Sequence, residues 1–269
     1  MAGDLLERPP GDFHDLVDRA VHQITEVVLS CEHKSVEWPL DQSERWWVPA
    51  ESSPEMVVEM TRRYGLHHLQ EAREALLKLS PDLRSRMTNE VHTTVGFNSG
   101  AGLVEMLFRL VGLGGHQTIM VDHSDSCGLV SLELSEQLGI TDVDFINSTT
   151  DLGRICPITT PVLLTASHAL NVRYTDECAQ TALESQNFDL LRCLEQNLVS
   201  ETYFCSIEPY MGRNKVPFLT RPFQDTGRDC ENVAIDSVNN QTWLQTGLGG
   251  RTKTVGWAVA AAARKNARL

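Results

Sequence analysis

A glycine-rich segment, Thr94–Gly102, constrains the fold of this chain more than any other stretch. The apolar run 103–108 follows it, and a β-branched segment, 118–121, then ends at Asp122. A strand, a tight turn, a helix and a second strand closing on a carboxylate make up the pattern of a nucleotide-binding unit. Glycines let the backbone approach a ligand closely, and a helix N-terminus offers N–H groups without partners. The pattern predicts a nucleotide site in which Asp122 accepts hydrogen bonds from ribose hydroxyls.

The glycine-rich segment has a second interpretation, because such turns join strands to helices in many α/β proteins that bind no nucleotide. From these residues alone, a nucleotide turn and a purely structural turn both stay open. Asp122 favours the nucleotide, since a strand that ends in a carboxylate about twenty residues after the glycines suits a ribose.

Length, cysteine content and net charge limit the classes of protein to which this chain can belong. The 269 residues suffice for one large domain, or for a domain with an added helical region. No apolar run is long enough for a membrane span and the N-terminus lacks the plan of a signal peptide, which predicts a cytoplasmic protein. Seven scattered cysteines without a C-x-x-C pair disfavour a disulfide framework and a metal site. A formal net charge of -13 disfavours a large nucleic-acid footprint and favours small molecules or proteins as substrates.

Residues 1–90 carry helical patterns and differ in texture from the rest. Apolar residues in 13–29 recur at spacings of three and four, which predicts an amphipathic helix that needs a partner. A second helical pattern covers 56–79, after a serine cap and a proline in the first turn. We expect this region to form a helical cap, in which Trp46 or Trp47 either packs or lines a substrate pocket.

From residue 91 onward short strands alternate with helices. Beyond the opening unit, the pattern predicts strands at 142–147, 161–166 and 203–209, and helices at 127–138 and 176–199. This alternation predicts a mostly parallel sheet with helices on both faces. Ligands of such sheets sit beyond the carboxyl ends of the strands, where the strand order reverses. The polar residues that end strands are therefore candidate site residues: Asp122, Asn147, Thr165, Ser167 and Glu208.

In the order of these parts, residues 60–269 resemble the class I, Rossmann-like methyltransferases that use S-adenosylmethionine. The family's glycine-rich first motif is similar to Thr94–Gly102, and its ribose-binding acid to Asp122. Four further segments are similar to its strand ends: 145–148 on the adenine side, 163–168 facing the methyl group, 206–209 as a fifth strand ending in Glu-Pro, and 255–261 as the antiparallel last strand.

The resemblance implies a class I methyltransferase-like α/β domain over residues 91–269, with S-adenosylmethionine as the cofactor. Residues 1–90 form the helical cap expected from their patterns. The sequence has no metal-ligand spacing with a nearby third ligand, so no metal is expected. His168, at the end of the methyl-facing strand, is either a catalytic base or a histidine that packs at a strand-to-helix turn. Glu208 either lines the acceptor pocket or bonds within the sheet edge. The implied cofactor-binding residues are Gly96, Asn98, Gly100, Gly102, Asp122, His123, Asn147, Ser148, Thr165 and Ser167.

Two positions depart from the family pattern. Gly96 stands where the family commonly carries an acid that helps to hold the amino end of the cofactor's methionine, and Asn98 stands where it usually has the first glycine. After glycine, asparagine tolerates left-handed backbone angles best, so the turn can still form. Glu105, Tyr64 and Arg63 are candidate substitutes for cofactor contacts, and each otherwise fits an ordinary helix-surface residue.

The expected function is methylation of a small molecule or, in second place, of a protein side chain. A nicotinamide-dependent dehydrogenase fits the glycines and Asp122 but not the closing strand 255–261. A non-catalytic, methyltransferase-like binding or scaffold protein fits the missing acid at Gly96. No pattern in the sequence indicates an oligomeric state. An RNA methyltransferase requires the basic residues of the C-terminal third to gather on one face: Arg213, Lys215, Arg221, Arg228, Arg251, Lys253, Arg264, Lys265 and Arg268.

Overall fold

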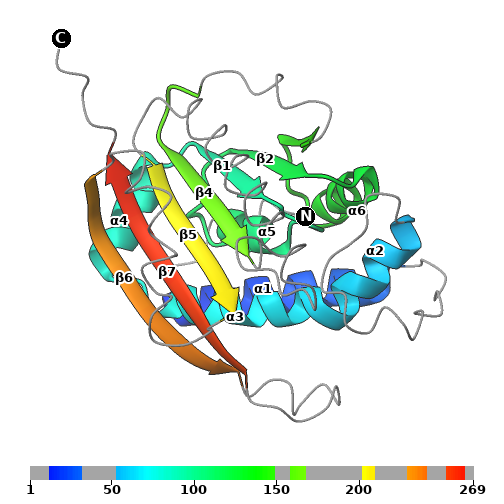
Figure 1. Cartoon of the computed structure of the whole chain (residues 1–269), viewed down its shortest axis with the longest axis horizontal. Coiled ribbons are helices and arrows are strands. Elements are labelled where there is room, and N and C mark those ends of the chain that lie inside the picture. The colour runs from blue at the N-terminus through cyan, green and yellow to red at the C-terminus, as the bar shows by residue number, and fades with distance from the viewer. Residues whose placement is uncertain are drawn as a thin grey trace, which may run out of the picture.

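The centre of the molecule is a seven-stranded sheet in the order β3-β2-β1-β4-β5-β7-β6 (Figure 1). The computed structural model describes residues 12–31, 53–148, 158–167, 202–209, 229–240 and 253–263. Every pairing between neighbours from β3 to β5 is parallel, which confirms the predicted parallel α/β sheet. These strands are β1 (Thr93–Phe97), β2 (Gln117–Asp122), β3 (Val143–Asn147), β4 (Val162–Ser167) and β5 (Thr202–Pro209).

Two long strands extend the sheet beyond β5. The backbone of β7 (Lys253–Ala263) pairs antiparallel with β5, and that of β6 (Asp229–Asn240) pairs antiparallel with β7. The pairing of β6 is irregular between Glu231 and Ala234. The sequence patterns predicted a strand at 255–261 and none at 229–240, so β6 was not predicted.

The strand order reverses at β1. Strands β2 and β3 follow β1 on one side, whereas β4 lies on its other side. Gly96, next to the end of β1, is level with Met120 in β2 and with Thr165 in β4. In open α/β sheets, ligands bind beyond the carboxyl ends of the strands at such a reversal. The end of β1 is therefore the place to look for a site.

Helices α5 (Leu103–Leu110) and α6 (Asp125–Gln137) connect β1 to β2 and β2 to β3. Both connections cross the sheet in the same direction, so their right-handed geometry puts both helices on one face. Every residue from 103 to 108 is buried, because α5 lies between the sheet and the N-terminal helices. The helix predicted at 176–199 lies outside the described residues, and helices on the opposite face stay a prediction.

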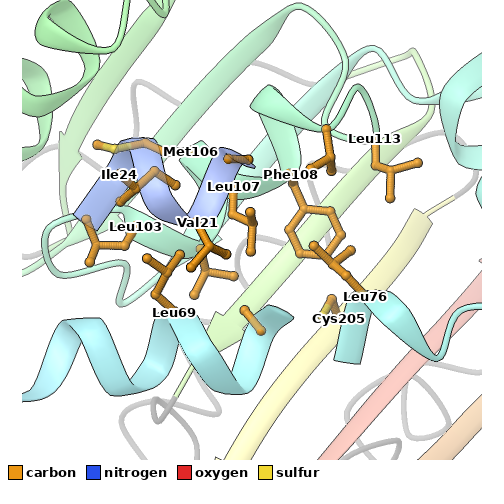
Figure 2. Packing of buried hydrophobic residues seen from close by; sticks show 14 of the residues in the cluster. Val21, Ile24, Leu69, Leu76, Leu103, Met106, Leu107, Phe108, Leu113 and Cys205 are labelled. Carbon is orange, nitrogen blue, oxygen red and sulfur yellow. The ribbon is translucent and has the colours of Figure 1, made fainter. Parts of the chain in front are cut away.

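The N-terminal helices share a hydrophobic core with α5. The elements are α1 (Phe13–Ser30), α2 (Pro54–Met60), the π-helical turn η3 (Thr61–Gly65), α3 (Leu66–Leu77) and α4 (Pro81–Glu90). Figure 2 shows Val21, Ile24 and Leu69 grouped near Leu103 and Leu107. The predicted apolar stripe of the first helix is therefore buried against α3 and α5. Burying an apolar side chain of this size contributes roughly 1.5–3 kcal/mol to stability.

Serine caps begin both α2, where the sequence predicted one, and α4. Ser53 Oγ accepts a hydrogen bond from the Met56 N–H at 3.3 Å, and Ser80 Oγ accepts one from the Leu83 N–H at 3.2 Å. The helix predicted over 56–79 is interrupted by η3. In the described part of the chain, no helix has both the length and the apolar character needed to cross a membrane.

Candidate functional site

The turn between β1 and α5 has an unusual backbone. Asn98, Gly100 and Gly102 all adopt the left-handed conformation, with φ of 47°, 55° and 74°. Asn98 therefore takes the place of a glycine in the way its tolerance of positive φ predicts. The Ser99 N–H donates to the Val121 carbonyl at 3.2 Å, and the Gly102 N–H donates to the Ser99 carbonyl at 2.9 Å. The turn is thereby held to the end of β2.

The two glycines of this turn have different surroundings. A Cβ atom on Gly102 would lie 2.4 Å from the sulfur of Met120, so this glycine lets α5 pack closely on β2. A Cβ atom on Gly100 would meet no protein atom within 4 Å. Gly102 is needed for packing, whereas Gly100 presents an open side of the backbone that a ligand can approach.

Asp122 lies beside the open side of the turn. Its side chain is 4 % exposed. Its Oδ2 accepts a hydrogen bond from the Gly100 N–H at 2.9 Å, and its Oδ1 accepts one from the Ser124 N–H at 3.1 Å. His123 Nδ1 is 3.2 Å from Oδ1. A carboxylate oxygen has two lone pairs, so Asp122 can hold the turn and still accept a ligand donor.

Asn147 and Ser148 continue the same edge of the sheet on β3. Asn147 is level with Asp122, and its Nδ2 donates to Asp125 Oδ1 at 2.7 Å, in the first turn of α6. The Ser148 N–H donates to the backbone carbonyl of Asp122 at 2.8 Å. The structure thus brings together the residues that the sequence placed on the ribose and adenine sides.

Hydroxyl groups at two strand ends have no hydrogen-bond partner among the described residues. Ser99 Oγ, in the turn after β1, and Ser167 Oγ, in the last residue of β4, are both buried and unpaired. A buried polar atom without a partner costs roughly 1–3 kcal/mol, which a polar group of a ligand can offset. Because the two serines lie on either side of the strand reversal, the site fits a polar ligand that spans it.

The side chains of the two catalytic candidates fall outside the described part of the chain. His168 lies outside the described residues, and so do Trp46 and Trp47. The backbone of Glu208 belongs to β5, whereas its side chain lies outside the described part. The roles expected for His168 and Glu208 therefore stay predictions. In the described part of the chain, no group of three or more His, Cys, Asp or Glu side chains could hold a metal ion.

Glu105 differs from its expected place on the helix surface. Only 2 % of it is exposed, and its Oε1 lies 2.7 Å from the position that a Cβ atom on Gly96 would take. Thr165 is also buried and faces α5, and its hydroxyl donates to Glu105 Oε1 at 2.5 Å. The expectation was wrong because α5 is buried on every side of its first turn. Arg63, in contrast, bonds Glu59 one turn earlier at 2.6 Å, as surface residues do.

Burial changes the acidity of Glu105. Burial, the largest cause, and the nearby Asp122 carboxylate raise its pKa from 4.5 to about 7. Hydrogen bonds from the Thr165 hydroxyl and from the backbone N–H of Glu105 itself act in the opposite direction. Two sequence signals mark this residue: a charge within the apolar run 103–108, and a glycine inside the strand that faces it.

Comparison with known proteins finds relatives by structure only. No family model and no curated protein matches the sequence. One chain from the complex between the Haloferax volcanii Trm112 methyltransferase activator and a proposed methyltransferase is 12% identical, with a TM-score of 0.51, over 78% of this chain and 95% of that one.

Two further structures are similar. A SAM-dependent methyltransferase from Aquifex aeolicus is 14% identical over 78% of this chain and 99% of that one, with a TM-score of 0.47. The YcgJ protein from Bacillus subtilis is 10% identical over 70% of this chain and 100% of that one, with a TM-score of 0.46. The likeness to the Haloferax volcanii complex chain, at a TM-score of 0.51, shows the fold alone: the chain has the class I, Rossmann-like fold that the sequence resemblance implied.

Proposed function

We propose that this protein is an S-adenosylmethionine-dependent methyltransferase that acts on a small molecule. The observation that carries the proposal is the turn at the reversal of strand order, where the open side of Gly100 lies next to the Asp122 carboxylate. A backbone that a ligand can approach, beside a carboxylate with lone pairs to spare, suits the ribose of a nucleoside. The formal net charge of -13 favours a small acceptor over a nucleic acid.

The residues at the site fit an adenosine-containing cofactor. In this proposal Asp122 would accept hydrogen bonds from ribose hydroxyls, and Asn147 and Ser148 would lie on the adenine side. The unpaired hydroxyls of Ser99 and Ser167 offer further hydrogen bonds. S-adenosylmethionine supplies, when bound, a methyl group on a positively charged sulfur that is already a good leaving group.

The remaining task of the protein is to align the acceptor with that methyl group and to exclude water. A base is needed only where the acceptor must lose a proton, and His168 is our candidate, with Glu208 lining the acceptor side. We also propose that residues 1–90 act as a cap that shapes the acceptor pocket. The position of α1 and α3 against α5, whose first turn adjoins the site, supports this role.

The antiparallel pairing of β7 with β5 supports a methyltransferase over a nicotinamide-dependent dehydrogenase. A closing antiparallel strand is part of the methyltransferase resemblance and is not expected of a dinucleotide dehydrogenase. Most of the basic residues on which an RNA substrate would depend lie outside the described residues, so no observation favours that alternative.

Calorimetry with four ligands side by side tests the proposal. S-adenosylmethionine and S-adenosylhomocysteine are expected to bind, and NAD and NADP are expected not to bind. Binding of NAD alone would replace the proposal with a dehydrogenase. Failure of all four to bind would leave a methyltransferase fold without the cofactor, as in a scaffold protein.

Gly100→Val is expected to abolish S-adenosylmethionine binding. It places a branched side chain on the open side of the turn, at a φ of 55° that branched residues rarely adopt. Asn98→Gly, in contrast, should keep the parent affinity, because glycine adopts its φ of 47° freely. Calorimetry measures both affinities.

Gly112→Val is the matched control for Gly100→Val. Gly112 has a φ of 76° and open space around its Cβ position, and it follows the other end of α5. The two valines therefore introduce similar backbone strain at opposite ends of one helix. Equal loss of binding in both variants would attribute the effect to strain, and parent-like binding by Gly100→Val would make the turn purely structural.

A further inference from the structure

The carboxyl group of Glu105 lies under the site, between the strands on either side of the reversal. Glu105 belongs to the first turn of α5, and its side chain covers Gly96 of β1. Gly96 is level with Thr165 of β4, and Thr165 is level with Cys205 of β5. The buried side chain of Glu105 thus lies against Gly96 and Thr165, in the row of residues that crosses the sheet from β1 to β5.

A single hydroxyl proton has two acceptors in this arrangement. Thr165 Oγ1 is 2.5 Å from Glu105 Oε1 and 3.3 Å from the Val95 carbonyl oxygen. A threonine hydroxyl has one proton to donate. When Glu105 is ionised, that proton goes to the carboxylate and the Val95 carbonyl loses it. When Glu105 is neutral, it can donate its own proton to Thr165, which then donates to Val95. The proton on Glu105 therefore completes a chain from α5 to β1.

In the described part of the chain, the titratable groups that act on Glu105 do not neutralise a charge on it. Asp122 in β2 is a carboxylate and raises the pKa of Glu105. Cys205 in β5 stays a neutral thiol, because burial and the charge of Glu105 raise its pKa far above neutrality. Gly96 and Thr165, from β1 and β4, do not titrate. A positive charge from a ligand would therefore find two acidic groups, one of which exchanges its proton near neutral pH.

We propose that Glu105 is a positioning residue that responds to ligand charge: near neutral pH it is only partly ionised in the ligand-free site, and it releases its remaining proton to solvent when a cationic ligand binds beside Asp122. The inference rests on the proposed function, because S-adenosylmethionine carries a positive sulfonium that the thioether S-adenosylhomocysteine lacks. In a buried site the attraction between that charge and an ionised Glu105 is only weakly screened, so it favours the ionised form without direct contact.

Calorimetry at about pH 7, in two buffers with different heats of ionisation, counts the protons released on binding. We expect the wild type to release more protons with S-adenosylmethionine than with S-adenosylhomocysteine, by up to about half a proton, since the pKa of Glu105 is about 7. Glu105→Gln should abolish this difference. Titration of the ligands' own groups is the same for both proteins and therefore cancels. An equal difference in the wild type and in Glu105→Gln would overturn the proposal.

Thermal unfolding without ligand tests whether the folded protein holds the proton on Glu105 more tightly than the unfolded chain does. Folded Glu105 holds its proton more tightly than the unfolded chain does, so its contribution to stability is greatest at low pH and is lost as the pH rises from 4.5 to about 7. Between about pH 5 and pH 8, the unfolding midpoint of the wild type should fall by roughly 5–10 °C relative to Glu105→Gln. Thr165→Val, which removes the donor to the carboxylate, should move this fall to higher pH.

The two measurements separate the failure of this inference from the failure of the proposed function. Coincident unfolding profiles of the wild type and Glu105→Gln overturn the proton chain whatever the ligands do. If both ligands bind and release equal numbers of protons, the response to charge is overturned while the cofactor assignment stands. If neither ligand binds, the proposed function fails and the response to charge fails with it.

Discussion

Replacing Asp122 with alanine is expected to weaken S-adenosylmethionine binding by roughly 1.5–3 kcal/mol, about 10- to 150-fold in affinity. The proposed ribose contact loses a charged acceptor. The turn also loses one of its two hydrogen bonds to β2, because the Gly100 N–H is left without the carboxylate while the bond from Ser99 to Val121 remains. The Ser124 N–H loses the same acceptor. The lost ribose contact and the weakened turn both lower affinity. Calorimetry at a temperature well below the unfolding midpoint of the variant measures the loss.

Two further variants separate the roles of Asp122. Asp122→Asn keeps one acceptor oxygen but loses the charge, so an intermediate affinity is expected. Asp125→Ala removes a nearby carboxylate, which bonds Asn147, and should have a smaller effect. Unchanged affinity in a folded Asp122→Ala protein would refute the assignment of the cofactor to this edge of the sheet.

The sequence predicted the parallel sheet and the turn because both follow from local patterns. The tolerance of asparagine for left-handed backbone angles predicted that Asn98 could replace a glycine, and its positive φ confirms this. The position of the strand reversal at β1 and the hydrogen bond from Gly100 to Asp122 were not predicted, because both depend on how the strands are ordered in space.

The place of Glu105 could not be predicted in the same way, because it depends on three elements that are distant in sequence. Helix propensity alone gives a glutamate in a first turn a surface position. The close packing of α5 between the sheet and the N-terminal helices buries it instead. β6 was missed for a related reason, since its pairing partner is β7, which lies later in the chain.

Gly96→Ala is expected to lower the free energy of unfolding by about 1–3 kcal/mol, as overpacking of a buried site does. Gly96 has no positive φ, so alanine fits the backbone and the cost must come from its surroundings. The new methyl group would lie 2.7–2.8 Å from three atoms of the Glu105 side chain, closer than real contacts allow. Denaturant unfolding at one fixed pH measures this cost.

A double-mutant cycle identifies Glu105 as the source of that cost. In a Glu105→Ala background the space above Gly96 is vacated, so Gly96→Ala should cost at least about 1 kcal/mol less than in the parent. In a Glu105→Gln background the side chain keeps its size, and the full cost should remain. Glutamine is therefore the matched control, since it removes the charge and leaves the obstruction. An equal cost of Gly96→Ala in all three backgrounds would show that Glu105 does not occupy the space over Gly96, and the proton chain through Thr165 would lose its geometric basis.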